Sequence, residues 1–289
     1  MPGWLNSIGS ILTSNHHHHQ DQSSKILNPN TIDMSALGPW IPLESNPEVF
    51  NKWAQRAGLV TNKDAFGDVY GLDDELLDIV PQPTKAVILL FPDVREAKAH
   101  QKQEDAKIAK DGQPHLDPTI YYVKQTIGNA CGTIALIHAL ANSNVNWDPS
   151  SPLHNFIVET KDKTPEERAS LLESRPLFAN IHAETAQDGQ TAPNIDTDLH
   201  FVCFVAAPDA DLRSVAKGEK EAKDVVPGES ESDTGMRLVE LDGRRPGPID
   251  HGVCTNLLKD VANLVKERYL SQTESVYFSL MALGPPLLD

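Results

Sequence analysis

Cysteine is scarce in this chain, with three residues among 289 and no regular spacing between them. An odd, scattered set of cysteines excludes a disulfide framework and fits a reducing compartment. Long apolar runs are also missing, since none approaches the roughly 20 residues that a membrane span needs. The N-terminus has no basic start followed by an apolar core, as a secretion signal would. We therefore expect a cytoplasmic protein, with the nucleus as a second location and no membrane association.

Basic residues are outnumbered, with 25 Lys and Arg against 41 Asp and Glu and a formal net charge of −16. This balance argues against nucleic acid as a partner and favours a basic protein. Metal-binding patterns are missing as well, because the three cysteines do not form CxxC pairs. A 39% hydrophobic content is enough for one substantial core, and the length allows one or two domains.

The most informative stretch runs from Lys124 to Leu140 and reads KQTIGNACGTIALIHAL. A turn at Gly128 and Asn129 precedes a run of good helix formers, which predicts a buried helix with Cys131 in its first turn. Because the free amide groups of a helix N-terminus favour a thiolate, Cys131 is a candidate nucleophile. Taken alone, the stretch is equally compatible with a buried structural cysteine.

A thiolate nucleophile needs a base and a group that orients the base. The run LHFVCFV (199–205) predicts a core strand with His200 near its start, and MRLVELDG (236–243) predicts a strand with Asp242 at its end. Gln125, six residues before the cysteine, carries an amide donor that an oxyanion could use. Each has an ordinary alternative: a hydrogen-bonded core histidine for His200 and a turn aspartate for Asp242.

Several stretches closely resemble the ubiquitin C-terminal hydrolase family, a group of papain-like cysteine peptidases. They are PWIPLESNPEVFNKW, FGDVYGLDDELLDIVPQPTKAVILLFP, QTIGNACGTIALIHA, TPEERASLLE, DLHFVCFV and VELDGRRPGPIDHG. The resemblance extends from Pro39 to the C-terminus, with one insertion.

The resemblance implies a role for each candidate residue. Cys131 matches the family's nucleophile, His200 its general base, Asp242 the residue that orients the histidine, and Gln125 the side chain that stabilises the oxyanion. The implied activity is hydrolysis at the C-terminal glycine of ubiquitin, releasing small or disordered adducts without a cofactor. Asp68, in the FGDVYG stretch, matches an acidic position near the docking site of ubiquitin's arginines, although it could equally belong to a solvated face.

Together these features predict one α/β domain of papain-like type over residues 39–289, with a mainly antiparallel central sheet flanked by helices. The strand order is implied by the resemblance alone, as is a loop within 177–198 that crosses the active-site cleft. Residues 1–38, including the HHHH run, lack periodicity and are expected to form a disordered extension. The mixed-charge segment at about 207–235 is expected to be a flexible insertion. We expect a monomer.

Two other functions are compatible with the sequence. The chain could be a hydrolase of the same chemistry for another ubiquitin-like protein, which would differ mainly in its surface contacts. Alternatively, it could be a ubiquitin-binding module that stabilises free ubiquitin, with a weakly active triad that is misaligned at rest. Reaction of Cys131 with an electrophile, before and after ubiquitin is added, would distinguish such a module from a preformed active site.

Overall fold

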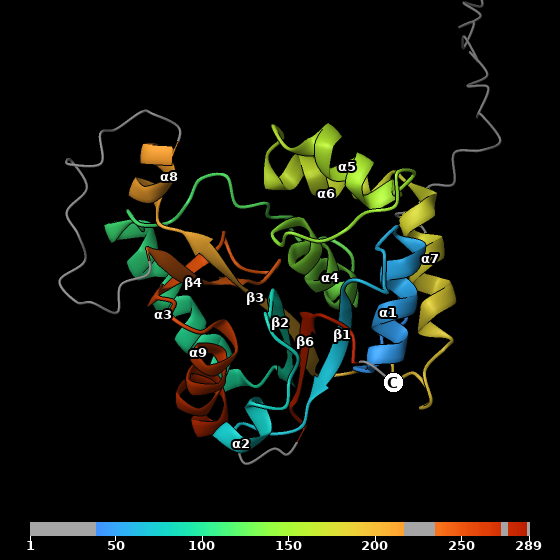
Figure 1. Cartoon of the computed structure of the whole chain (residues 1–289), viewed down its shortest axis with the longest axis horizontal. Coiled ribbons are helices and arrows are strands. Elements are labelled where there is room, and N and C mark those ends of the chain that lie inside the picture. The colour runs from blue at the N-terminus through green and yellow to red at the C-terminus, as the bar shows by residue number, and fades with distance from the viewer. Residues whose placement is uncertain (1–38, 217–234, 273–276, 288–289) are drawn as a thin grey trace, which may run out of the picture. The chain divides into compact units, whose positions relative to one another are not determined.

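Six strands form one sheet in the computed structural model, which describes residues 39–216, 235–272 and 277–287 (Figure 1). The spatial order is β1-β6-β2-β3-β4-β5, and every neighbouring pair is antiparallel. The strands are β1 (Ala65–Val69), β2 (Ala86–Pro92), β3 (Leu199–Pro208), β4 (Met236–Leu241), β5 (Ile249–Val253) and β6 (Ser279–Gly284). The predicted antiparallel α/β architecture is confirmed.

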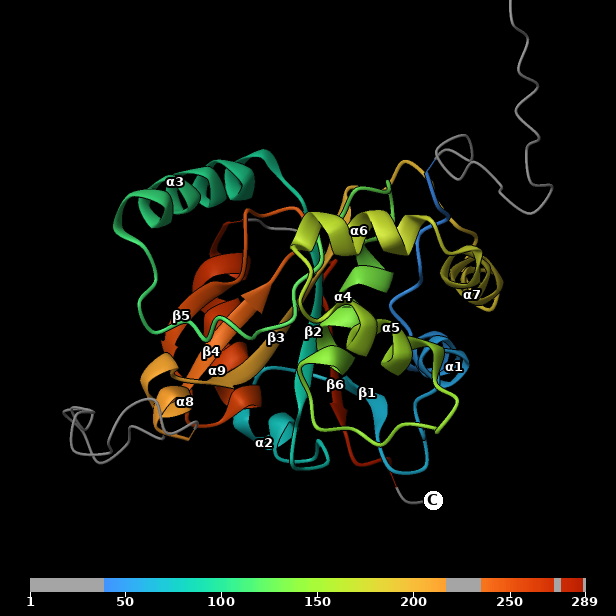
Figure 2. The same cartoon turned by 90° about the horizontal axis from the view of Figure 1, so that it is seen from above.

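Helices cover both faces of this sheet (Figures 1 and 2). On one side lie α1 (Pro47–Arg56), α4 (Cys131–Ala141), α5 (Pro152–Thr160), α6 (Pro165–Glu173) and α7 (Pro176–Ala186). On the other side lie α2 (Asp74–Leu77) and α9 (Leu257–Leu264), which continues into a π-helical turn (Val265–Tyr269) and a 3-10 turn (Leu270–Gln272). The remaining helices are α3 (Arg95–Asp111) and α8 (Ala210–Ala216).

The central strand β2 explains why this region reads as an unbroken apolar run. Its residues alternate between two apolar clusters, with Ile88 facing the α4 side and Val87 and Leu89 facing the α9 side. Because both faces of the strand are covered, no position needs a polar side chain. The neighbouring strand β3 has the same alternation, with Cys203 on the α4 side and Phe204 on the α9 side.

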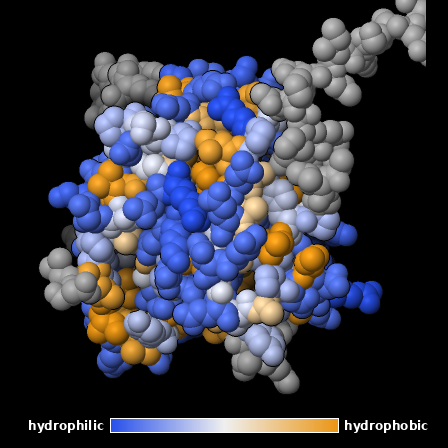
Figure 3. Space-filling view, turned by 90° about the vertical axis from the view of Figure 1, so that its right-hand side faces the viewer, coloured by the Kyte–Doolittle hydropathy of each residue, from blue (hydrophilic) through white to orange (hydrophobic). Residues whose placement is uncertain are grey.

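Local capping signals begin the helices where the sequence indicates. Asn46 caps α1 through the Glu48 amide, and Thr164 and Glu167 form the predicted capping box at α6. Figure 3 looks onto the side of the molecule that carries α1 and α7, where hydrophilic residues form a broad band. On this face Lys52 and Arg56 of α1 lie within ion-pair distance of Asp188.

α3 is a long helix with almost no apolar anchor. None of its 17 residues is buried, and its side chains are mostly charged or amide-bearing. Across the described segments of the chain, no helix combines the length and apolar character needed to cross a membrane.

Two boundaries differ from the sequence-based expectations. A loop was expected within residues 177–198; α7 occupies the first part of this range, and the loop occupies residues 187–198. The insertion was expected to begin at about 207, but β3 continues to Pro208 and α8 follows. In both places local hydrogen bonding and packing order a polar sequence. Residues 1–38 and 217–234, including the HHHH run, lie outside the described residues.

Candidate active site

Cys131 is the first residue of α4 and is 7% exposed. The preceding residue, Ala130, offers no side-chain cap, so the first amide groups of the helix are left for other acceptors. Asn129 has φ of 60°, a left-handed conformation that Asn tolerates, and turns the chain into the helix. The missing Cβ of Gly132 leaves room for Leu43, whose side chain lies 3.1 Å from where that atom would be. Gly132 therefore allows close packing of Leu43 against the start of α4.

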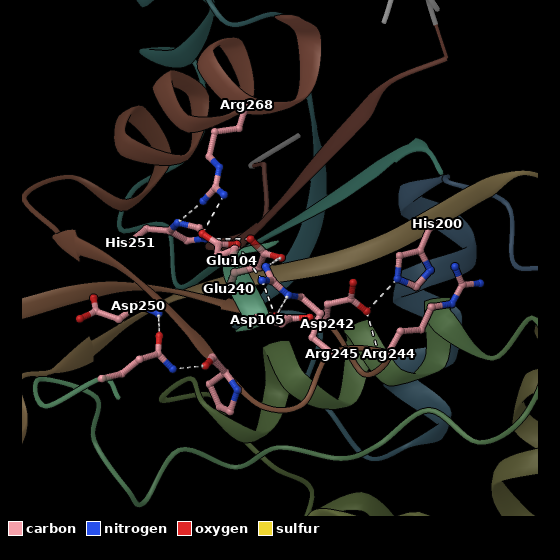
Figure 4. Close-up of polar contacts among 12 residues, drawn as sticks. Glu104, Asp105, His200, Glu240, Asp242, Arg244, Arg245, Asp250, His251 and Arg268 are labelled. Atoms are coloured by element: carbon pink, nitrogen blue, oxygen red, sulfur yellow. Dashed lines mark hydrogen bonds and ion pairs between the residues drawn. The ribbon is translucent and has the colours of Figure 1, made fainter. Parts of the chain in front are cut away.

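His200 and Asp242 lie together beneath the N-terminus of α4. His200 Nε2 is 2.8 Å from Asp242 Oδ1, and both side chains are 2% exposed (Figure 4). The same Asp242 oxygen accepts a hydrogen bond of 2.9 Å from the Arg244 amide. His200 belongs to β3, opposite Phe91 of β2, and its ring meets the Phe91 ring edge-on. These contacts fix the imidazole plane.

The other imidazole nitrogen of His200, Nδ1, is buried and has no hydrogen-bond partner within the described residues. Burial opposes ionisation of the Cys131 thiol, yet its interaction with His200 lowers the thiol pKa, and Arg244 adds a smaller effect. Burial likewise opposes protonation of His200, but Asp242 and the thiolate raise its pKa to about 10. The geometry therefore favours a thiolate–imidazolium pair.

Gln125 is held near Asp242 mainly by its backbone. Its amide donates 2.9 Å to the Gly243 carbonyl. This bond ties the segment before Cys131 (124–130), here called the nucleophile loop, to the residue after Asp242. A Cβ on Gly243 would approach the Gln125 nitrogen within 3.0 Å, so this contact requires glycine. The Gln125 side-chain NH₂ donates 3.2 Å to the Ile127 carbonyl, and its Oε1 is buried with no partner among the described residues.

A loop passes next to the nucleophile. Residues 187–198 connect α7 to β3, and the Ile195 carbonyl accepts a hydrogen bond of 3.1 Å from Asn129, two residues before Cys131. On the α1 side, Glu44 accepts two hydrogen bonds of 2.8 Å from Thr191. These contacts fasten the loop at two points.

Asp68, Cys203 and Cys254 lie apart from this centre. Asp68 is an exposed residue of the edge strand β1, and partial desolvation raises its pKa. Burial raises the pKa of the Cys203 thiol, and burial together with Asp260 raises that of Cys254 to about 12. These shifts oppose formation of a thiolate at both positions. No group of three or more potential metal ligands occurs in the described part of the chain.

The sequence contains no indication of the residues that support Asp242 through its backbone. The Tyr122 hydroxyl lies 2.6 Å from the backbone carbonyls of both Asp242 and Arg245. Arg245 is 3% exposed and surrounded by carboxylates. A run of adjacent arginines after a strand gave no local signal of which one would be buried.

A buried thiol at a helix N-terminus, next to an imidazole that is hydrogen-bonded to a carboxylate, defines the class of thiol hydrolases. The model of "Ubiquitin carboxyl-terminal hydrolase, family 1" matches residues 40–270. The chain therefore belongs to the ubiquitin carboxyl-terminal hydrolase family of cysteine peptidases.

Relatives in plants and animals match over most of their length. Ubiquitin carboxyl-terminal hydrolase 3 of Arabidopsis thaliana is 36% identical over 249 residues, covering 85% of this chain and 94% of the relative. The human isozyme L1 is 35% identical over 246 residues, covering 84% and 96%. The catalytic domain of Trichinella spiralis UCH37, solved bound to ubiquitin vinyl methyl ester, has a TM-score of 0.58 at 22% identity, covering 86% and 96%. The last comparison confirms the fold.

Proposed function

We propose that this chain hydrolyses the bond between the C-terminal glycine of ubiquitin and small or disordered adducts, with Cys131 as the nucleophile. The observation that carries the proposal is the convergence of Cys131, His200 and Asp242 in a member of this family. Its named relatives are ubiquitin carboxyl-terminal hydrolases, which makes ubiquitin the expected partner.

In the first half of the reaction, the Cys131 thiolate adds to the glycine carbonyl carbon and forms a C–S bond. The Cys131 amide and the Gln125 side-chain NH₂ donate to the resulting oxyanion. For this, Gln125 exchanges its long hydrogen bond to the Ile127 carbonyl for one to the oxyanion. The intermediate then expels the amine, which takes a proton from the His200 imidazolium, and leaves a thioester.

In the second half, the neutral His200 removes a proton from water as the water oxygen adds to the thioester carbonyl. Collapse of this intermediate breaks the C–S bond, releases the ubiquitin carboxyl group and restores the thiolate–imidazolium pair. Asp242 keeps the imidazole oriented in both halves through its 2.8 Å contact with Nε2. No step calls on a metal or organic cofactor.

The restriction to small or disordered leaving groups follows from the loop at residues 187–198. Its hydrogen bond to Asn129 puts backbone next to the nucleophile, so an adduct has to pass the loop to reach Cys131. A folded protein attached to ubiquitin is bulkier than an extended peptide at this point. We expect ubiquitin joined to a short peptide to be cleaved faster than ubiquitin joined to a folded domain.

Asp68 is proposed to contact ubiquitin. It is exposed on the edge strand β1 beside a pocket that is partly lined by Val69, Leu72 and Phe278. A carboxylate there complements a partner with basic residues on its tail and recognition face. The expected effect of Asp68→Asn is a higher KM at unchanged kcat.

The decisive experiment is mass spectrometry after incubation with ubiquitin vinyl methyl ester. Wild type and Cys203→Ala should each gain one ubiquitin mass, and Cys131→Ala should gain none. If wild type forms no adduct but still binds ubiquitin, a binding module replaces the hydrolase. If it neither reacts nor binds, while a probe made from another ubiquitin-like protein reacts, the partner is that protein.

We also propose a monomeric protein of the cytoplasm, with the nucleus as a second location and no nucleic-acid or membrane partner. All three cysteines are free thiols, which agrees with a reducing compartment. The strongly acidic balance of the chain supports a protein partner. Light scattering after size-exclusion chromatography and imaging of a tagged chain test the two statements.

A further inference from the structure

Six charged or titratable side chains, here called the Arg245 cluster, lie directly behind Asp242 and take no part in the proposed chemistry (Figure 4). Arg245 is at its centre and is 3% exposed. Its guanidinium donates to Asp105 at 2.6 and 3.0 Å, to Glu104 at 2.7 Å and to Glu240 at 3.3 Å. The cluster consists of Glu104, Asp105, Glu240, Arg245, His251 and Arg268.

The cluster joins parts of the chain that are far apart in sequence. Glu104 and Asp105 come from α3, Glu240 from β4, His251 from β5 and Arg268 from the π-helical turn after α9. Arg268 donates 2.7 Å to the second oxygen of Glu104, so this carboxylate bridges two arginines. A buried arginine with several carboxylate partners is rigid, since each contact restricts the planar guanidinium.

The hydrogen bonds also determine the proton positions. Arg268 lies 2.9 Å from His251 Nδ1, and because a guanidinium can only donate, Nδ1 accepts. Nε2 therefore carries the proton and donates 2.7 Å to Glu240. One Glu240 oxygen thus accepts from the imidazole of His251, and the other faces Arg245. Each of the two buried groups at the centre, Glu240 and Arg245, depends on the other for its charge balance.

The α3 helix is attached to the domain through these charges. None of its residues is buried, and the side that faces the domain carries Glu104 and Asp105. Because no apolar side chain of α3 is fully buried, ion pairs are the main force available to hold the helix in place. The contacts of Arg245 therefore decide where α3 lies.

Arg245 is also part of the turn that presents Asp242. Its amide donates 3.0 Å to the Asp242 carbonyl, and the Tyr122 hydroxyl contacts the carbonyls of both residues at 2.6 Å. Lys124, next to Gln125, donates 2.5 Å to the Arg245 carbonyl. A displaced Arg245 would therefore shift the carbonyls that fix Asp242 and the start of the nucleophile loop.

We propose that Arg245 is a positioning residue: by locking the Asp242–Arg245 turn against α3, it keeps Asp242 Oδ1 on His200. α3 then influences the reaction at a distance, through Glu104 and Asp105. The kinetic test of this inference rests on the proposed function, whereas the positioning role itself does not depend on the identity of the substrate.

Electrostatics point in the same direction. Burial would raise the pKa of Glu240, but His251, Arg245 and Arg268 hold it at about 2. Glu240 lies two residues before Asp242, and its negative charge opposes ionisation of that carboxyl. Without Arg245, less of the negative charge of Glu240 would be compensated, which would raise the pKa of Asp242 and weaken its hold on the imidazolium.

The test compares Arg245→Met and the α3 double variant Glu104→Gln/Asp105→Asn with wild type. The matched control is Arg237→Met. Arg237 of β4 forms a two-bond ion pair with Asp250 of β5, the two strands that also carry Glu240 and His251, but it does not contact the Asp242–Arg245 turn. Two readouts are needed: kcat and KM on ubiquitin with a fluorogenic C-terminal amide, and the pH dependence of Cys131 alkylation by iodoacetamide in the free protein.

We expect Arg245→Met to lower kcat by about 10–100-fold, the effect of a small displacement in an active site, with KM changed much less. Its alkylation profile should move to higher pH. The α3 double variant should show the same changes in weaker form with Arg245 still present, and Arg245→Lys should fall between Met and wild type. Arg237→Met should behave as wild type in both readouts.

The proposal is overturned if Arg245→Met and the double variant melt at lower temperature but keep the wild-type kcat and alkylation profile, since the cluster would then only stabilise the fold. Should Arg245→Met fail to fold, the double variant and Arg245→Lys decide alone. If wild type does not cleave the ubiquitin amide, the proposed function fails, while the alkylation profiles still test the positioning role.

Discussion

Replacing Asp242 with Asn separates the charge of the triad carboxylate from its hydrogen bond. Asp242 Oδ1 accepts from the Arg244 amide at 2.9 Å and lies 2.8 Å from His200 Nε2. Because both neighbours donate, the amide oxygen of Asn should take the same place, and the NH₂ group should point away. The variant therefore keeps the acceptor but loses the negative charge.

The size of the effect follows from the burial of the pair. A close opposite charge shifts a pKa by about 1–3 units. Asp242 is the first of the groups that raise the pKa of His200 against burial, and the imidazolium in turn lowers that of Cys131. In Asp242→Asn the Cys131 pKa should rise, so the thiolate is lost at a higher pH as the solution is acidified. We expect kcat near neutral pH to fall by about 10–1,000-fold, less than the ~10⁴ of the same change in a Ser-His-Asp triad, where the tautomer is lost.

The assay is the rate of Cys131 alkylation by iodoacetamide across pH, together with kcat on a fluorogenic ubiquitin amide. Asp242→Ala, which removes both charge and acceptor, is the companion variant and should lose more kcat than Asn. Two results refute the reasoning. An Asn profile that overlays wild type would mean that the carboxylate charge does not control the thiolate. Equal loss in Asn and Ala would mean that the amide oxygen does not hold His200.

Three further substitutions, one of them with a matched control, test the packing and capping of the domain. Gly243→Ala would bring a Cβ within 3.0 Å of the Gln125 nitrogen and should lower kcat by about 10–100-fold, whereas Gly247→Ala, with no atom within 4 Å, should not change kcat. Phe50→Ala removes a fully buried ring and should lower the free energy of unfolding by about 3–5 kcal/mol in urea titration. Thr164→Ala removes the cap of α6 and should cost about 1 kcal/mol in the same assay, with unchanged kcat.

Each residue of the proposed triad has a local signature in the sequence. Cys131 follows a turn and begins an apolar helix, His200 begins an apolar strand, and Asp242 ends one. Their convergence, however, is a property of the sheet: antiparallel pairing places β4 beside β3 and so brings Asp242 to His200. Periodicity cannot supply that pairing, and only the family resemblance indicated it.

The elements that were misjudged are those whose stability comes from tertiary contacts. α7 was not predicted as a helix because its sequence is rich in small and polar residues, yet Pro176 at its start is a recognisable first-turn signal. Its buried face includes Phe178, Ile181 and His182, and the His182 ring contacts the Ile41 carbonyl at 2.6 Å. A partner from the distant N-terminal side of the domain thus completes the helix.

The Arg245 cluster shows the same limit for charged residues. In the sequence, Glu104 and Asp105 lie in a charge-rich stretch with few apolar residues, and Arg245 is 140 residues away from Asp105. A charge run is usually a solvated face, and only the fold shows that two of these carboxylates have a buried partner. Pairing of charges over such separations leaves no pattern in one sequence.

The two arginines after Asp242 differ in their exposure to solvent. Arg244 is half-exposed, pairs with Asp93 at 2.6 Å and contributes to the lowered pKa of Cys131. Its effect should weaken as salt is added, because exposed charges are screened. Arg245 is buried among carboxylates and should respond little to salt. Raising ionic strength should therefore raise the pH at which Cys131 becomes alkylated in wild type but not in Arg244→Gln, while the effect of Arg245→Met should persist at every salt concentration.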